Sequence, residues 1–149
     1  MRINSINSKK GFSLVELAIG LAVLTVLILS ISVSAGLRDN ARVQSAANSV
    51  QTLRSAAESY LALGKVNFTG MTVDSLKTSK LLPNGFVAAK SNPWGGDFAV
   101  TTNASDNSRF DITLSSLAKT EAEKLSNYFN NSATKVAYDE TNTTWTVTF

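Results

Sequence analysis

The length, composition and charge of this chain limit the classes of protein to which it can belong. Its 149 residues suffice for one modest domain, and 44% of them are hydrophobic, which is enough to form a core. The absence of Cys and His excludes disulfides, thiolate chemistry and histidine ligands or bases. The net charge of +3 comes from the N-terminus, because 11 basic and 11 acidic residues follow Gly11. We therefore expect no enzyme, metal site, cofactor or small-molecule substrate, and nucleic-acid binding, which needs a clustered basic face, is disfavoured.

A long apolar stretch follows a short basic segment at the N-terminus. The first ten residues carry three basic side chains, Arg2, Lys9 and Lys10, and no acidic one. Residues 12–37 are apolar or small apart from Glu16. At about 1.5 Å rise per residue, such a helix is long enough to cross a bilayer core of ~30 Å. The upstream positive charges predict a cytoplasmic N-terminus, with the rest of the chain on the outside.

The helical pattern continues beyond the apolar stretch. From residue 38 to 63, apolar residues recur at steps of three and four, namely Ala46, Ala47, Val50, Leu53, Ala57, Tyr60 and Leu61. This spacing predicts an amphipathic helix that packs one face on a domain. No proline interrupts residues 12–63, and Gly64 suits a helix C-terminus. We predict one helix of roughly 52 residues, on the order of 78 Å long, with Gly20 and Gly36 as its weak points.

The remaining residues, 64–149, are predicted to form a compact α+β head with two short helices. Thr72 is a candidate cap for the first helix, which is expected to run to Lys80. The second helix is expected from a capping box of Thr120 and Glu123 to about residue 130. Its predicted inward-facing residues are Ala122, Leu125, Tyr128 and Phe129.

Alternating apolar residues predict a β-sheet in the same head. Residues 97–102 and 109–114 alternate as two strands, and residues 135–138 and 143–149 form a predicted terminal hairpin. The segment NPWGG, residues 92–96, favours a tight turn over a ligand-binding loop, because Pro and Gly supply its dihedral angles. The predicted aromatic and aliphatic core consists of Trp94, Phe98, Phe110, Tyr128, Phe129, Trp145, Val147 and Phe149.

The segment KKGFSLVEL, residues 9–17, resembles the class III leader and mature start of type IV pilins and their pseudopilin relatives. In that family a prepilin peptidase of the inner membrane cuts after the glycine and methylates the new N-terminus, and a glutamate at the fifth mature position is kept. The resemblance implies cleavage between Gly11 and Phe12, N-methylation of Phe12, and a role for Glu16 in the register of assembly. The basic residues of the leader would be Arg2, Lys9 and Lys10.

The position of Glu16 has a physical interpretation beside the resemblance. A carboxylate inside a bilayer or an apolar bundle is costly unless a positive group meets it. Cleavage after Gly11 would create such a group, the amine of Phe12, for a Glu16 of the same or a neighbouring chain. Two plainer interpretations remain open: Glu16 as an interfacial residue at a membrane edge, and residues 12–37 as an ordinary single-pass anchor.

The resemblance also implies the type IV pilin fold, in which a long N-terminal α-helix (about 12–63) packs on an antiparallel β-sheet head with short helices. The chain then divides into a leader (1–11), a transmembrane or filament-core half-helix (12–37), an amphipathic half-helix (38–63) and a head (64–149). The residues expected to pack in the filament core are Leu17, Ile19, Leu21, Val23, Leu24 and Leu27. The head resembles type IVb pilins, in which a disulfide commonly staples the C-terminal part, whereas this chain has Ala122 at the comparable helix.

The leading prediction is a structural subunit of a bacterial type IV pilus. Its expected partners are copies of itself in a helical homopolymer, the prepilin peptidase and the inner-membrane assembly machinery. Before assembly it would lie in the inner membrane, with the N-terminus cytoplasmic and the head outside, and afterwards in an extracellular filament for adhesion, aggregation, motility, DNA uptake or conjugation. The alternatives are a pseudopilin of a type II secretion system and a single-pass membrane-anchored binding protein. The subclass, IVa or IVb, stays open.

Overall fold

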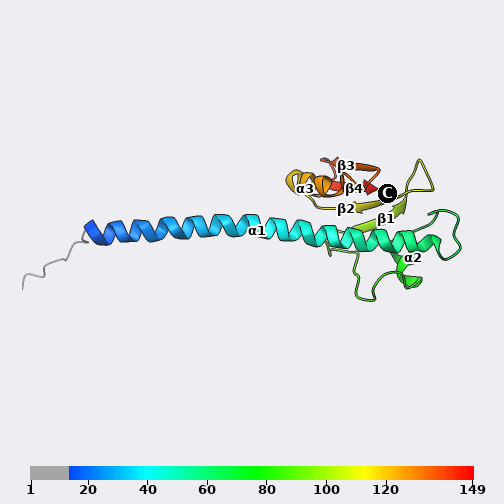
Figure 1. Cartoon of the computed structure of the whole chain (residues 1–149), viewed down its shortest axis with the longest axis horizontal. Coiled ribbons are helices and arrows are strands. Elements are labelled where there is room, and N and C mark those ends of the chain that lie inside the picture. The colour runs from blue at the N-terminus through cyan, green and yellow to red at the C-terminus, as the bar shows by residue number, and fades with distance from the viewer. Residues whose placement is uncertain (1–13) are drawn as a thin grey trace, which may run out of the picture. The chain divides into compact units, whose positions relative to one another are not determined.

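The fold comprises three helices and four strands over residues 14–149, which a computed structural model of the chain describes, except for the side chains of residues 26, 27 and 29–35. The helices are α1 (Leu14–Leu61), α2 (Val73–Thr78) and α3 (Lys119–Phe129). The strands are β1 (Phe98–Thr102), β2 (Phe110–Leu114), β3 (Lys135–Asp139) and β4 (Thr144–Thr148) (Figure 1). Two compact units, Met1–Arg38 and Asp39–Phe149, divide the chain within α1.

The helix α1 is continuous over its described length and ends two residues before the predicted position. After Leu61 the amide N–H groups of residues 62–64 donate to carbonyls three residues back, at 3.1, 3.2 and 3.1 Å. These shorter-range bonds tighten the last turn. Gly64 then takes a φ of 84°, the left-handed conformation that commonly follows a helix end. The predicted role of Gly64 is confirmed, and the helix predicted to end at about residue 63 ends at Leu61.

The short helix α2 begins as predicted and stops early. Its cap is Thr72, whose Oγ1 accepts from the amide of Ser75 at 3.1 Å, while the Ser75 Oγ accepts from the amide of Thr72 at 2.9 Å. This reciprocal pair satisfies two donors that the helix leaves free. The expected extension to Lys80 is wrong, because the helix ends at Thr78 and Lys80 takes a φ of 56°.

The helix α3 starts two residues earlier than the capping-box pattern predicts. Its N-cap is Ala118, and Thr120 lies inside the helix with its hydroxyl donating to the Glu121 carboxylate at 2.9 Å. The position where the helix begins is set instead by Leu117, the residue before the N-cap. Leu117 is buried, and its amide donates to the Thr143 carbonyl at 3.0 Å. The capping box of Thr120 and Glu123 is therefore wrong, because a tertiary contact decides where the helix begins.

The four strands form one antiparallel sheet in the order β1-β2-β4-β3, which confirms the predicted strands. Registers such as Val100↔Ile112 and Ile112↔Val147 place the buried side chains of neighbouring strands on a common face. The exposed or half-buried residues between them point to the other face, because successive side chains of a strand alternate.

The core of the head lies between this sheet face and the buried stripe of α1. Both belong to one cluster together with the inner face of α3. Of the predicted core residues, five are buried, namely Phe98, Phe110, Phe129, Trp145 and Val147, and two are half-buried, namely Trp94 and Phe149. The inward placement of Tyr128 is wrong, because its side chain is 47% exposed. Ala122, in the first turn of α3, is buried. At the position where type IVb pilins commonly have a disulfide cysteine, this chain therefore packs an alanine into the core.

Candidate assembly surfaces

Glu16 lies in the first turn of α1 with an exposed side chain. Amide N–H groups at a helix N-terminus lack intrahelical acceptors and carry partial positive charge, so a carboxylate is favourable there. Residues 1–13 lie outside the described part of the chain. The predicted cleavage site at Gly11 and Phe12 and the basic residues Arg2, Lys9 and Lys10 are among them. The pairing of Glu16 with the amine of Phe12 therefore stays a prediction.

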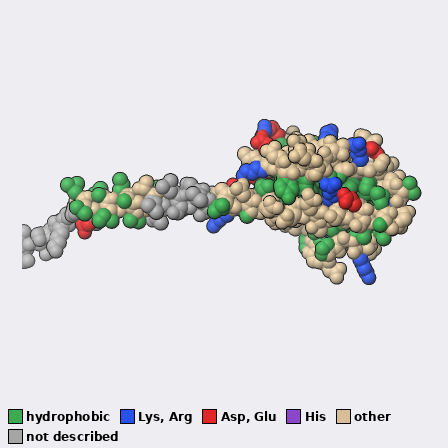
Figure 2. Space-filling view, in the orientation of Figure 1, with side chains coloured by type: hydrophobic (Ala, Val, Ile, Leu, Met, Phe, Trp, Pro, Cys, Tyr) green, Lys and Arg blue, Asp and Glu red, His purple; other side chains and the backbone are tan. Residues whose placement is uncertain are grey.

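Large apolar side chains of the first part of α1 are exposed in the single chain, as the green surface of Figure 2 shows. The five predicted core-packing residues with described side chains are Leu17 at 62%, Ile19 at 59%, Leu21 at 66%, Val23 at 53% and Leu24 at 57% exposed. The sixth, Leu27, falls among the residues whose side chains are not described. Burying such side chains is strongly favourable, so this half of α1 presents an unfilled packing surface.

A membrane span was also predicted for this region, over residues 12–37. Within the described part of the chain, no helix combines the length and the apolar character needed to cross a membrane.

The second half of α1 has its packing partners within the chain. One face is buried in the head through Val43, Ala46, Ala47, Val50, Leu53, Ala56, Ala57 and Tyr60, which confirms the predicted stripe except for half-buried Leu61. On the rest of the surface, the hydroxyls of Ser49, Thr52 and Ser59 donate to helix carbonyls four residues back, at 3.1, 3.0 and 2.8 Å. The exposed side of this half is therefore polar and satisfied locally.

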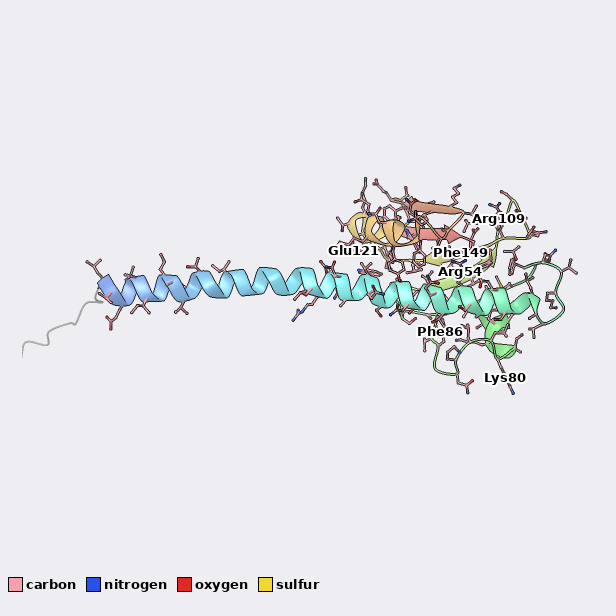
Figure 3. All side chains as sticks on the ribbon, viewed as in Figure 1. Arg54, Lys80, Phe86, Arg109, Glu121 and Phe149 are labelled. Atoms are coloured by element: carbon pink, nitrogen blue, oxygen red, sulfur yellow. The ribbon has the colours of Figure 1, made fainter. Side chains whose placement is uncertain are left out.

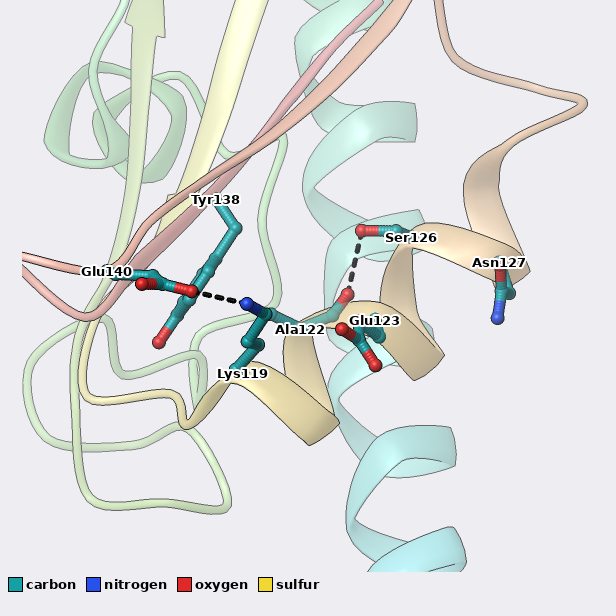
Figure 4. A pocket seen from close by; sticks show the side chains of 7 residues that line it. All are labelled: Lys119, Ala122, Glu123, Ser126, Asn127, Tyr138 and Glu140. Carbon is teal, nitrogen blue, oxygen red and sulfur yellow. Dashed lines mark hydrogen bonds and ion pairs between the residues drawn. The ribbon is translucent and has the colours of Figure 1, made fainter.

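A hollow of about 560 Å³ opens between α3 and the end of β3 (Figure 4). Its lining residues are Lys119, Ala122, Glu123, Ser126, Asn127, Tyr138 and Glu140. The Lys119 ammonium lies 2.6 Å from a Glu140 carboxylate oxygen, and this hydrogen bond and charge raise the pKa of Lys119 above its usual value. The hollow is thus a polar surface feature with an ion pair at its rim.

The hydroxyl groups of the hollow serve the fold. The Tyr138 hydroxyl donates to the Leu117 carbonyl at 2.8 Å. The Ser126 hydroxyl donates to the Ala122 carbonyl at 2.7 Å and accepts from the Trp145 indole N–H at 3.0 Å. Among the described residues, neither hydroxyl is paired with a side-chain base, as an activated nucleophile would be. The hollow therefore suits docking better than covalent chemistry.

Exposed carboxylates of the head support turns. Hydrogen bonds from the side chain and amide of Asn142 and from the amide of Thr141 lower the pKa of Asp139. The hydroxyl and amide of Ser108 lower the pKa of Asp106, with a smaller contribution from the charge of Arg109. Groups held in their charged form by local hydrogen bonds are turn supports, not general acids.

The NPWGG segment is organised by Asn92, a residue that pattern reasoning did not single out. Its buried side chain accepts from the amides of Trp94 and Gly96 at 3.0 and 2.8 Å and donates to the Ser115 carbonyl at 2.7 Å. A Cβ on Gly96 would lie 2.1 Å from that carbonyl oxygen. The structure therefore supports the predicted turn over a ligand loop. The available signal was the Asn itself, which forms such local turns readily.

Comparisons with known families cover most of the chain. Residues 6–32 match the family model described as a prokaryotic N-terminal methylation motif, a segment that contains Gly11, Phe12 and Glu16. Residues 34–115, more than half of the chain, match the bundlin family model. A search of curated proteins finds no match. The two family matches meet within α1, near the point where the exposed half of the helix gives way to the buried half.

Proposed function

Because the chain belongs to the bundlin family of type IV pilins, we propose that it is cut between Gly11 and Phe12 and polymerises through the apolar half of α1. Type IV pilins of this family are structural subunits of a pilus filament, not enzymes. The observation that carries the proposal is the exposure of apolar residues in the first half of α1, beside a second half whose apolar stripe is buried.

Polymerisation would bury the exposed side chains against α1 helices of other subunits. Removing a Leu, Ile or Val side chain from water contributes about 1.5–3 kcal/mol. Each subunit offers several such side chains, among them Leu17, Leu21 and Leu24, so helix bundling provides a large driving force in water. When the subunit starts from lipid, the gain comes instead from close helix packing, because lipid tails are as apolar as Leu.

We propose an inner-membrane stage before assembly. Residues 12–37 would hold the subunit there, with the N-terminus cytoplasmic and the head outside. The apolar composition of this stretch and the basic residues Lys9 and Lys10 before it support this orientation. The proposed partners at this stage are the prepilin peptidase and the inner-membrane assembly machinery, followed by other copies of the chain.

Glu16 would act as a register check during assembly. The carboxylate is costly in an apolar bundle unless a cation meets it. Cleavage after Gly11 frees the amine of Phe12, and an axial offset between neighbouring helices would bring that amine to Glu16. Subunits out of register would leave both charges unpaired, so the pair would favour one stagger over the others.

The processing step is tested by co-expressing the full chain with a prepilin peptidase and measuring the intact mass of the product. We expect a product that starts at Phe12 and carries one added methyl group. Retention of Met1, or a cut after the apolar stretch, would overturn the proposal.

The register role is tested with Glu16→Ala and, as a matched control on the same helix, Glu58→Ala. Glu16→Ala should be processed normally but yield at least tenfold fewer filaments in electron micrographs. The control should assemble, because Glu58 is exposed in the head half of α1. Normal filaments from Glu16→Ala would remove Glu16 from the assembly mechanism.

A further inference from the structure

Charged side chains of the head are divided unevenly between two segments. Residues 62–96 carry four lysines and one acidic residue, Asp74, whereas residues 97–149 carry four basic and seven acidic residues. The net charges are therefore +3 and −3. The four lysines are all exposed. Within the described part of the chain, no salt bridge involves Lys77 or Lys80, so their charges are available to another molecule.

The two short helices of these segments lie on different sides of the head half of α1. The helix α2 lies on one side of α1, and α3 lies on the other (Figure 1). Figure 3 shows Lys80 and Glu121 projecting from these opposite sides. Lys77 of α2 and Lys80 after it therefore have no route to the acidic residues beside α3 in the same molecule. Such an arrangement suits contact between copies.

The hollow between α3 and β3 has the chemistry to receive a lysine. Its rim carries two carboxylates, Glu123 and Glu140, and one ammonium, Lys119, which already pairs with Glu140. Glu123 is exposed and has no salt bridge to a described residue. The Tyr138 ring and the Ala122 side chain line the wall and would contact the methylene stem of a lysine, as apolar surfaces commonly do.

We propose that this hollow receives two lysines of a neighbouring subunit in the filament, Lys77 in α2 and Lys80 just after its end. The contact joins two different surfaces, and a head-to-tail contact of this kind generates an open helical polymer when its rotation does not close into a ring. Exposed ion pairs contribute little affinity, and salt screens them. Their effect is to select orientation between heads, while the apolar halves of α1 supply the driving force. The inference therefore rests on the proposed polymerisation.

The contact is tested by cross-linking, which the absence of Cys in the chain makes specific. The double variant Lys80→Cys with Glu123→Cys is assembled into filaments and treated with a short bis-maleimide. We expect a ladder of multimers on a denaturing gel. Each single variant should give no ladder, and neither should the pair Lys65→Cys with Glu123→Cys, whose lysine follows the end of α1 instead of the end of α2.

Charge exchange provides the second readout. Lys80→Glu and Glu123→Lys should each lower filament yield at least threefold at low salt, and the two together should restore it. If the wild type forms filaments but the double-Cys variant gives no ladder and the double charge exchange restores no yield, the head contact is overturned. Polymerisation through α1 is then left intact. A wild type that forms no filaments would overturn polymerisation, and the head contact with it.

Discussion

The two halves of α1 differ in what covers their apolar side chains. In the first half, Leu17, Leu21 and Leu24 are more than half exposed, whereas in the second half Val50 and Leu53 are fully buried. The secondary structure is the same in both. The difference shows that one helix can carry two kinds of packing surface, one covered by its own head and one exposed in the described part of the chain.

The side chains of the two halves suit these tasks. The buried stripe of the second half contains four alanines, Ala46, Ala47, Ala56 and Ala57, which allow the head to approach the helix closely. The first half instead presents large aliphatic side chains around the helix. Small residues favour a fixed, close contact with one partner, and larger ones reach several neighbours at once.

The largest expected contrast comes from one substitution made in each half. Leu53→Ala should lower the free energy of unfolding of the head by about 2–5 kcal/mol, because it leaves a cavity in the core. Leu24→Ala should change it by less than about 0.5 kcal/mol but reduce filament yield. The measurement is urea unfolding of the full chain in detergent, followed by tryptophan fluorescence. If Leu53→Ala and Leu24→Ala lowered the free energy of unfolding by the same amount, the two halves of α1 would not differ in how the head covers them.

Adding volume tests the same contrast from the other direction. Ala47 is fully buried, and Ala22 is exposed. Ala47→Leu should destabilise the head by about 1–3 kcal/mol through overpacking, while Ala22→Leu should leave head stability unchanged in the same unfolding experiment. If Ala47→Leu left the stability of the head unchanged, the head would not be closely packed against α1 at this position.

Replacing Gly20 in α1 and Gly64 just after α1 by alanine should change stability in opposite directions. A Cβ on Gly20 meets no heavy atom within 4 Å, so Gly20→Ala should stabilise the helix by about 1 kcal/mol. Gly64 has a φ of 84°, where a Cβ is strained, so Gly64→Ala should destabilise the head by about 1 kcal/mol. Thermal circular dichroism of the full chain measures both. Destabilisation by Gly20→Ala would point to strain within the first half.

The smallest expected effect concerns the ion pair of the head half. Arg54 Nε lies 2.8 Å from a Glu58 carboxylate oxygen, and such exposed pairs four residues apart contribute about 0.3–0.5 kcal/mol. Glu58→Gln should cost about that much, because Arg54 keeps its position 4.4 Å over the Phe149 ring. A double-mutant cycle with Arg54→Ala measures the coupling, which should fall as salt is raised. A coupling above about 1 kcal/mol would contradict this view.

Most elements of the fold follow from local patterns. The apolar spacing of residues 38–63 predicted the buried stripe of α1, and the alternation predicted all four strands. The incorrect predictions concern features that depend on contacts between residues far apart in the sequence. Leu117 and Thr143 set the start of α3, overriding the Thr120 signal. Tyr128 sits at the border of the helical face, and Phe129 took the buried position beside Trp145.

The candidate assembly surfaces also differ in whether the sequence alone could predict them. The processing and assembly motif, from Lys9 to Glu16, is contiguous and can be recognised without a fold. Lys77 and Lys80, in and just after α2, are about forty residues from α3 in the sequence, so only the folded chain shows that α2 and α3 lie on opposite sides of α1.

The sequence alone determined the long helix, its change from uniformly apolar to amphipathic, the strands and the pilin motif, because each depends on residues a few positions apart. Tertiary structure decided which apolar surface the chain covers by itself, where the short helices begin and end, and how charge is arranged on the head. These depend on contacts between distant residues, whose packing outweighs local preferences that are typically about 1 kcal/mol.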